Sequence, residues 1–134
     1  MLKFISPMFA LMLMSASALA VDFPECKGGA YQVIRLDEIK DGKWDLFVKA
    51  VKDHAAWYAA NGRPDKIELG RLLEKNAVTG ALSYSQKQAL TIHSVMEKPE
   101  EPKPTDAAWA AFVQEYRDSS EIKKTVVACV GAAE

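Results

Sequence analysis

Hydrophobic and polar positions change their spacing early in the chain, and the change marks a strand followed by a helix. Residues 31–39 are rich in β-branched and aromatic side chains and predict a strand. From residue 43 to 61 the hydrophobic positions recur at the 3.6-residue period of a helix. Asp41 is a candidate N-cap, and Asn61-Gly62 followed by Pro64 predicts the helix end, because proline cannot continue a helix.

The rest of the chain predicts two strands, a second helix and a final strand. The strands cover residues 66–73, 89–96 and 122–130, and the helix, capped by Thr105 or Asp106, runs to about Arg117. Residues 81–84 fit neither period, and a helical turn over 120–124 is an alternative to the start of the last strand. Both helices have an apolar stripe that favours packing on a sheet. Its members are Trp44, Phe47, Val51, His54 or Ala55, and Tyr58 in the first helix, and Trp109, Phe112, Val113 and Tyr116 in the second.

This order, β-α-β-β-α-β, predicts a ferredoxin-like α+β fold with a four-stranded antiparallel sheet and two helices on one face. Right-handed crossovers place the strand at 31–39 between those at 89–96 and 122–130, antiparallel to the last strand. The start of the first strand then meets the end of the last one, which brings Cys26 and Cys129 together. We therefore expect a disulfide between them; two free buried thiols are the alternative, and the spacing does not fit a zinc site.

The first twenty residues have the three parts of a cleavable signal peptide. Lys3 provides the positive charge, residues 8–14 are an apolar run, and Ala18 and Ala20 occupy the small-residue positions of the cleavage site. A membrane anchor is the alternative, but the run is shorter than the roughly 20 apolar residues that a span needs. Val21 stands where a lipid anchor would need cysteine. We expect a periplasmic or secreted protein with no membrane anchor after cleavage.

Cleavage leaves 114 of the 134 residues, with 16 basic and 18 acidic side chains and a formal net charge of −2. That length fits one domain over residues 31–130, preceded by a lead-in at 21–30 and followed by a tail at 131–134. The proline-rich segment 97–104 is interpreted as a loop within this domain. The charge provides no basic surface for nucleic acid, and no cofactor-binding motif is present, so we expect neither partner.

Four segments together resemble the dimeric α+β barrel proteins, which include the antibiotic-biosynthesis-monooxygenase-like and stress-responsive barrel families. They are the opening strand with Tyr31, Val33 and Arg35, the run DGKWDLF from residue 41, HAAWY from residue 54, and WAAFVQEY from residue 109. The resemblance covers most of residues 31–130 and rests on element order and apolar spacing. It implies a homodimer of two sheets packed face to face, with a pocket between each sheet and its helices. Haem-degrading members use a histidine on the second helix, which this chain lacks.

The chain has two histidines, and both are candidates for chemistry. His54 lies on the apolar stripe of the first helix, where burial would keep it neutral and able to act as a general base. His93 shares one strand face with Thr91 and Val95. For each histidine the alternative is a structural side chain hydrogen-bonded in the core. A metal site is not predicted, because nothing identifies the carboxylate that a two-histidine site would need.

Trp57, Tyr58, His93 and Trp109 are the predicted lining of a ligand pocket, with core packing as the alternative. Arg35 and Asp37 alternate with Ile34 and Leu36 and are predicted to face a dimer interface or solvent. Two functions follow. The first is binding of a hydrophobic or aromatic small molecule, or an accessory role, without catalysis. The alternative is a cofactor-independent monooxygenase-like enzyme with His54 as its base.

Overall fold

The structure, a computed structural model, describes residues 24–95 and 104–131. The predicted signal peptide and most of the proline-rich loop lie outside these residues. In chain order the elements are β1 (Ala30–Ile39), α1 (Trp44–Ala60), β2 (Lys66–Lys75), β3 (Leu82–Val95), α2 (Ala107–Ser119) and β4 (Ser120–Val130). This is the predicted order. No helix among the described residues is long and apolar enough to cross a membrane.

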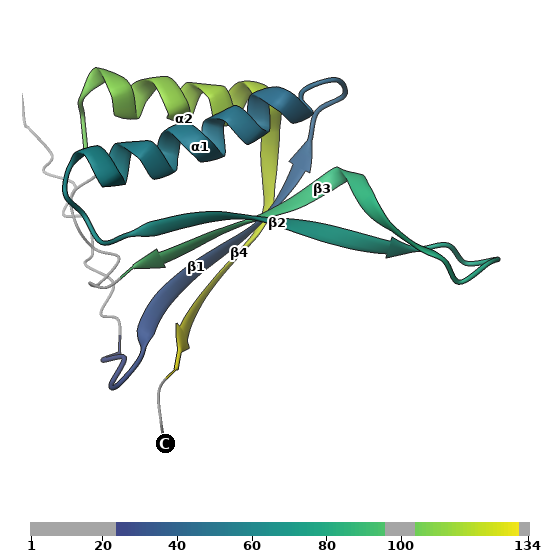
Figure 1. Ribbon diagram of the computed structural model, residues 1–134, viewed down its shortest axis with the longest axis horizontal. Coiled ribbons are helices and arrows are strands. Elements are labelled where there is room, and N and C mark those ends of the chain that lie inside the picture. Colours follow the sequence, from purple (N-terminus) through teal and green to yellow (C-terminus); the bar gives the residue numbers. More distant parts are fainter. Residues whose placement is uncertain (1–23, 96–103, 132–134) are drawn as a thin grey trace, which may run out of the picture.

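The four strands form one antiparallel sheet in the order β2-β3-β1-β4, and both helices cover the same face of it (Figure 1). The ferredoxin-like α+β fold is thereby confirmed. β1 is a central strand: Val33 lies opposite His93 of β3 on one side and opposite Val127 of β4 on the other. Side chains directly opposite each other point to the same face, so this register determines which residues of the three strands meet beneath the helices.

Two strands begin two or more residues before the predicted start. β3 begins at Leu82 rather than at residue 89, because Leu82 and Tyr84 pair with Lys75 and Leu73 of β2. Such pairing supplies strand hydrogen bonds that local spacing does not reveal. β4 begins directly after α2 at Ser120, so the alternative helical turn over 120–124 is wrong.

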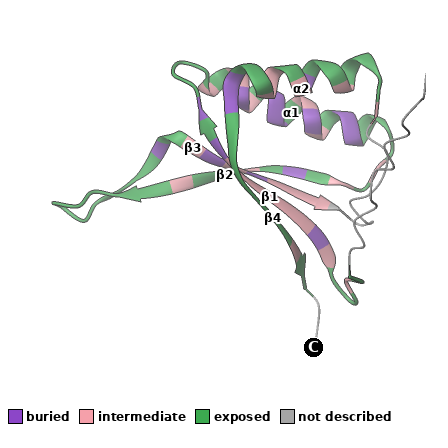
Figure 2. Ribbon diagram, turned by 180° about the vertical axis from the view of Figure 1, so that it is seen from behind, coloured by how far each residue is buried: buried purple, intermediate pink, exposed green. Residues whose placement is uncertain are grey.

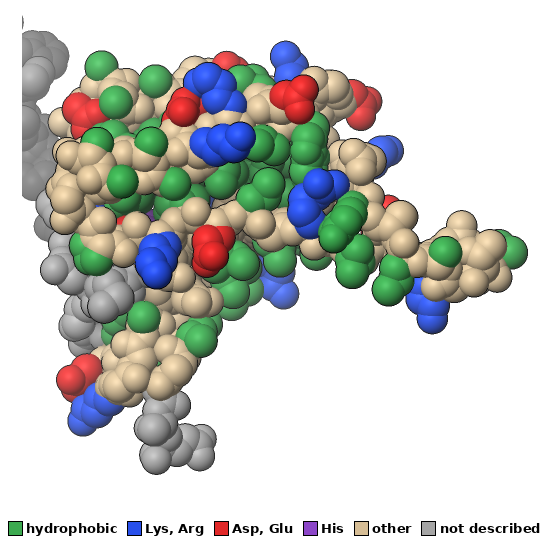
Figure 3. All heavy atoms as spheres, in the orientation of Figure 1, with side chains coloured by type: hydrophobic (Ala, Val, Ile, Leu, Met, Phe, Trp, Pro, Cys, Tyr) green, Lys and Arg blue, Asp and Glu red, His purple; other side chains and the backbone are tan. Residues whose placement is uncertain are grey.

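The outer part of the β2–β3 hairpin, residues 72–86, forms an arm that projects from the body (Figure 1). Its turn is stabilised by the Asn76 side chain, which accepts hydrogen bonds from the backbone N–H groups of Val78 and Thr79. Hydrophobic side chains are exposed along the arm (Figure 3). They are Leu73, Val78, Leu82 and Tyr84.

The core lies between the helices and the sheet. Buried positions recur along the sheet-facing side of α1, whereas most of α2 is exposed (Figure 2). The core cluster consists of Ile39, Phe47, Val51, Trp57, Tyr58, Ile67, Ala89 and Phe112. Asp106 caps α2 by accepting a hydrogen bond from the N–H of Trp109. The predicted cap of α1 is wrong: residues 40–43 close a turn through Lys43 N–H and Lys40 C=O, and the helix starts beyond it without a side-chain cap.

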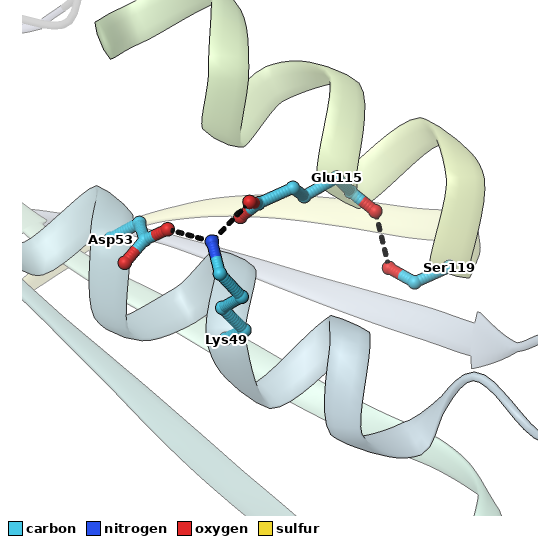
Figure 4. A network of polar contacts seen from close by, with 4 residues as sticks. All are labelled: Lys49, Asp53, Glu115 and Ser119. Carbon is cyan, nitrogen blue, oxygen red and sulfur yellow. Dashed lines mark hydrogen bonds and ion pairs between the residues drawn. The ribbon is translucent and has the colours of Figure 1, made fainter.

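A polar cluster links the outer sides of the two helices (Figure 4). The ammonium of Lys49 on α1 pairs with Asp53 one turn further along and with Glu115 of α2. Ser119 then donates to the backbone carbonyl of Glu115 at 2.7 Å. The hydrogen bonds of Lys49 with Asp53 and Glu115 raise the pKa of Lys49. The hydrogen bond between Lys49 and Asp53 also lowers the pKa of Asp53. The side chains of Lys49 and Asp53 are 57% and 45% exposed, whereas that of Glu115 is 19% exposed. Because ion pairs with an exposed member add little stability, these contacts mainly fix the relative position of the helices.

Cys26 and Cys129 form the predicted disulfide, with their Cα atoms 5.5 Å apart. β1–β4 pairing accounts for it, because Tyr31 lies opposite Cys129 and Cys26 precedes Tyr31 on the lead-in. The bond closes a loop with a sequence separation of 103, in effect the whole domain. A loop of this length stabilises a fold by about 4–5 kcal/mol when the entropy of the unfolded chain is considered.

Replacing both cysteines by serine is expected to lower the free energy of unfolding by about 4–5 kcal/mol, because the unfolded chain regains its entropy. Urea unfolding of the native and Cys26→Ser/Cys129→Ser proteins measures the difference. Adding a reductant to the native protein should reproduce the loss and should leave the double variant unchanged. Equal stability of the oxidised and reduced native protein would contradict the expectation.

Candidate ligand-binding site

The helix-facing side of the central strands has a row of polar side chains where a core would normally be apolar. Asp37 and Thr91 are buried, and Arg35 and His93 are half-buried. The prediction that Arg35 and Asp37 face solvent or a dimer interface is wrong. They share the face of Ile39, which packs into the core beneath α1. The prediction that Arg35 and Asp37 share one face of β1, opposite to Ile34 and Leu36, is correct. The alternation alone does not indicate which of the two faces the helices cover.

Asp37 is satisfied within this row. Its side chain is 2% exposed, and it accepts hydrogen bonds from the hydroxyl groups of Thr91 at 3.1 Å and Ser120 at 3.3 Å. Burial raises the pKa of Asp37, although the two hydrogen bonds and the charge of Arg35 oppose the shift. The group thus connects three strands and has no other hydrogen-bond partner among the described residues.

His54 extends from α1 into a ring of aromatic side chains above this row. It is 6% exposed and stacks on Phe112 with the ring centroids 4.4 Å apart. Its other ring neighbours are Tyr58, His93, Trp109 and Tyr116, at 5.3 to 5.8 Å. Its Nδ1 atom lies 3.3 Å from the Tyr116 hydroxyl, whereas its buried Nε2 atom has no hydrogen-bond partner.

The environment of His54 strongly favours the neutral imidazole. Burial, followed by the charges of His93 and Arg35, lowers its pKa from 6.5 to about 3, and the attraction of Asp65 offsets only part of this. Burial also raises the pKa of the neighbouring Tyr116 hydroxyl. A phenol is the natural donor to a neutral imidazole, so we assign the hydrogen of that contact to Tyr116. The orphan Nε2 atom of His54 then has the imidazole hydrogen.

His93 belongs to a second polar group at the start of β2. Its Nε2 atom lies 2.9 Å from Oδ1 of Asp65, whose side chain is 4% exposed and also accepts from Nε of Arg63 at 3.2 Å. Burial lowers the pKa of His93 more than Asp65 raises it, and Arg35 and Arg63 lower it further. With Nε2–H donated to Asp65, the Nδ1 atom of His93 has the lone pair.

The structure brings the two histidines together, with ring centroids 5.7 Å apart. Tyr58 and Trp109, two of the predicted lining residues, contact His54 directly. Trp57 lies one layer further out. Its indole N–H donates to both carboxylate oxygens of Asp106 at 3.0 and 3.1 Å, and its ring contacts Tyr58 and Trp109. Cys26 and Cys129 are bonded to each other and take no part in the cluster.

Sequence reasoning missed Asp65, Arg63 and the role of Tyr116. Asp65 lies in the short connection after Pro64, where no periodic pattern indicates which side chains turn inward. Tyr116 was identified only as part of an apolar stripe. A partial signal existed: the register of β1 with β3 follows from the fold and places Val33 and Arg35 beside His93 and Thr91.

The site therefore offers two neutral imidazoles, a phenol and the guanidinium of Arg35 among aromatic rings, whereas the guanidinium of Arg63 is paired with Asp65. Within residues 24–95 and 104–131 no group of three or more histidine, cysteine, aspartate or glutamate side chains is placed to hold a metal ion. The chemistry available from these residues is hydrogen bonding, ring stacking and proton transfer by an imidazole.

Comparison with known proteins adds little. No family model matches the chain, and no curated protein matches it. A phage SAM lyase in complex with S-methyl-5'-thioadenosine matches among solved structures, with a TM-score of 0.29 and 12% sequence identity, over 85% of this chain and 100% of that chain. At that level of similarity we draw no conclusion from the match.

The depressed pKa of His54 makes stability depend on pH. The unfolded chain binds a proton near pH 6.5 and the folded chain only near 3, so stability is complete above pH 6.5 and falls as the pH is lowered towards 3. At roughly 1.4 kcal/mol per pH unit, the loss at pH 5 is about 2 kcal/mol.

We expect the native protein to lose about 2 kcal/mol more than His54→Phe between pH 7.5 and 5, as measured by urea unfolding at both pH values. In His54→Phe the phenyl ring can still stack on Phe112, but the titrating imidazole is gone. His93→Phe is the control, because it retains His54 and hence this part of the slope. Parallel pH profiles of the native protein and His54→Phe would show that His54 is accessible to protons in the folded state.

Proposed function

We propose that this protein binds a small aromatic or otherwise hydrophobic molecule between its sheet and its helices, either as a binding protein or as an accessory module, in the manner of the dimeric α+β barrel proteins. The observation that supports this most directly is the buried Nε2 atom of His54, which lacks a hydrogen-bond partner in the middle of an aromatic cluster. Buried polar atoms are nearly always paired. A ligand that brings an acceptor atom would pair it.

The composition of the space also favours binding over packing alone. A purely structural core of this size would use aliphatic side chains, since each buried polar group must be satisfied to avoid a cost of about 1–3 kcal/mol. Here Asp37, His54 and His93 all lie beneath the helices. Convergent polar groups on an aromatic background are typical of small-molecule sites.

Export is part of this proposal. Its support is the signal-like segment of residues 1–20 together with the disulfide between Cys26 and Cys129. Disulfides form and persist in oxidising compartments such as the periplasm or the extracellular space. The protein would then bind its ligand outside the cytoplasm. This is consistent with a sequence that has no nucleotide-binding motif.

N-phenyl-1-naphthylamine, an uncharged aromatic probe that fluoresces in apolar surroundings, is expected to bind saturably to the purified protein. Trp109→Leu should weaken binding roughly tenfold, because it removes an aromatic wall of the site. Trp44→Leu is the matched control: Trp44 is also half-buried on a helix, but its ring contacts Phe47 and the Arg71 guanidinium. Absence of saturable binding, or equal effects of both substitutions, would reject the proposal.

A cofactor-independent monooxygenase-like enzyme is the second candidate, and the Asp65–His93 pair favours it. A carboxylate that orients an imidazole leaves the other ring nitrogen available as a general base. On this reading His93, not the predicted His54, is the better base, because a pKa of about 3 makes His54 a weak one. Turnover of a quinol by the native protein that His93→Gln abolishes would move the conclusion to this candidate.

We also propose that two copies associate through the outer face of the sheet, which neither helix covers. On that face Ile34 lies opposite Ile92, and Leu36 lies opposite Leu90. All four are only half-buried, and Val126, opposite Ile34, is 41% exposed. A contiguous aliphatic patch of this kind is typical of an interaction surface, and a two-fold axis would bury the same patch on both copies.

Light scattering after size exclusion should therefore give twice the mass of the mature chain. Ile92→Lys should yield the monomer, because it would bury an unpaired charge in the interface. Ala56→Lys is the control, since it puts the same charge on the exposed side of α1. A native protein that is monomeric at all concentrations would contradict the proposal.

A further inference from the structure

We propose that the ligand of this site bears an anionic oxygen group, such as a carboxylate on an apolar body, and that Arg35 binds that group. The inference rests on the proposed function and specifies the class of ligand. Its starting point is the position of Arg35 on the helix-facing side of β1, opposite Thr91 and two residues along from Val33, which lies opposite His93. The charge of Arg35 also acts on His54, His93 and Tyr116.

Arg35 has no direct hydrogen-bond or ion-pair partner among the described residues, although its charge acts on Asp37. Arg35 is half-buried, and among these residues no ring contact engages its guanidinium either. A guanidinium has five N–H donors and keeps its charge at any relevant pH. A partly desolvated arginine without a carboxylate is unusual, because such groups are normally paired when they leave bulk water.

The two carboxylates nearest to the cluster are already engaged elsewhere. Asp37 accepts hydrogen bonds from Thr91 and Ser120 and has no ion pair within 4.0 Å. Asp65 is bound by Arg63 and His93. The residues opposite Arg35 in the register are Thr91 and Thr125, and neither has a charge. A carboxylate in direct contact with Arg35 would therefore have to come from outside the described residues, because Asp37 acts on Arg35 only through its charge.

The position of Arg35 also suits a ligand that is apolar at one end. On the β1–β3 side, the inner face is closed by buried Thr91 beneath the helices. On the β4 side, Thr125 is exposed and Val127 is 42% exposed, although both lie on the inner face. Arg35 therefore lies between the part of the inner sheet face that is buried, on the β3 side, and the part that is exposed, on the β4 side. An apolar body could contact the half-buried ring of Trp109 while its anionic group remains beside the guanidinium.

The second orphan group supports the same ligand class. With the Tyr116 hydroxyl donating to Nδ1, the buried Nε2 of His54 is a donor without an acceptor. Arg35 likewise offers only donors. A buried donor without an acceptor and a half-buried cationic donor group are complementary to acceptor oxygens rather than to a cationic or donor-rich ligand.

Two probes with the same aromatic skeleton test this inference. 1-Anilinonaphthalene-8-sulfonate has a sulfonate, whereas N-phenyl-1-naphthylamine is uncharged. We expect the anionic probe to bind roughly tenfold more tightly, as a charge-assisted hydrogen bond of ordinary strength gives. Arg35→Gln should remove that advantage and leave binding of the neutral probe unchanged, and Arg35→Lys should retain part of it. Arg117→Gln is the matched control, because Arg117 is exposed on α2.

The outcomes separate this inference from the proposed function. If neither probe binds saturably, both are wrong. If the neutral probe binds as well as the anionic one, or if Arg35→Gln and Arg117→Gln have the same effect, the site binds apolar molecules but Arg35 does not select an anion, and the inference fails. Unchanged binding of the neutral probe to Arg35→Gln also shows that this variant is folded, so a lost preference cannot be attributed to unfolding.

Discussion

The pairing of β1 on both of its edges is the constraint on which the rest of the structure depends. One edge sets His93 beside Val33, and the other sets Cys129 beside Tyr31. The first pairing places a histidine beneath α1, where it meets His54, and the second allows the disulfide that closes the domain. A shift of one residue in either register would turn every side chain of that strand to the opposite face. The candidate site and the disulfide therefore both depend on the register of β1 with its two neighbouring strands.

The same register places polar side chains where the fold would gain most from apolar ones. Most of this cost is offset locally: Thr91 and Ser120 satisfy Asp37, and Arg63 and His93 satisfy Asp65. Two groups of this network have no direct partner among the described residues, the buried Nε2 atom of His54 and the half-buried guanidinium of Arg35. A network that served stability alone would have no reason to leave the buried Nε2 atom unpaired, since an unpaired buried group costs stability. The division between satisfied and unsatisfied members is thus the strongest sign of function in the molecule.

Sequence periodicity was enough to predict the element order, the strand order and the disulfide, because these depend on long amphipathic segments and on the handedness of crossovers. It failed where one element depends on another. The first three residues of β3 pair with β2, and the inward side of β1 is decided by where the helices lie. Of the candidate site, His54, His93, Tyr58 and Trp109 could be predicted from their positions on stripes and alternating faces. Asp65 could not, since a connection of a few residues has no period to interpret.

The state of the two histidines bears on the choice between binding and catalysis. A general base works best with a pKa near the operating pH, and burial has moved His54 far from that range, to about 3. What His54 retains is a directed hydrogen-bonding atom that is neutral at physiological pH, and this is a useful property for recognising a ligand. His93 has the oriented geometry of a base, but its hydrogen bond to Asp65 also serves to hold the start of β2 against β3. The imidazole of His54 is thus too weak a base, and that of His93 has a structural role. Together these two properties favour ligand recognition over catalysis.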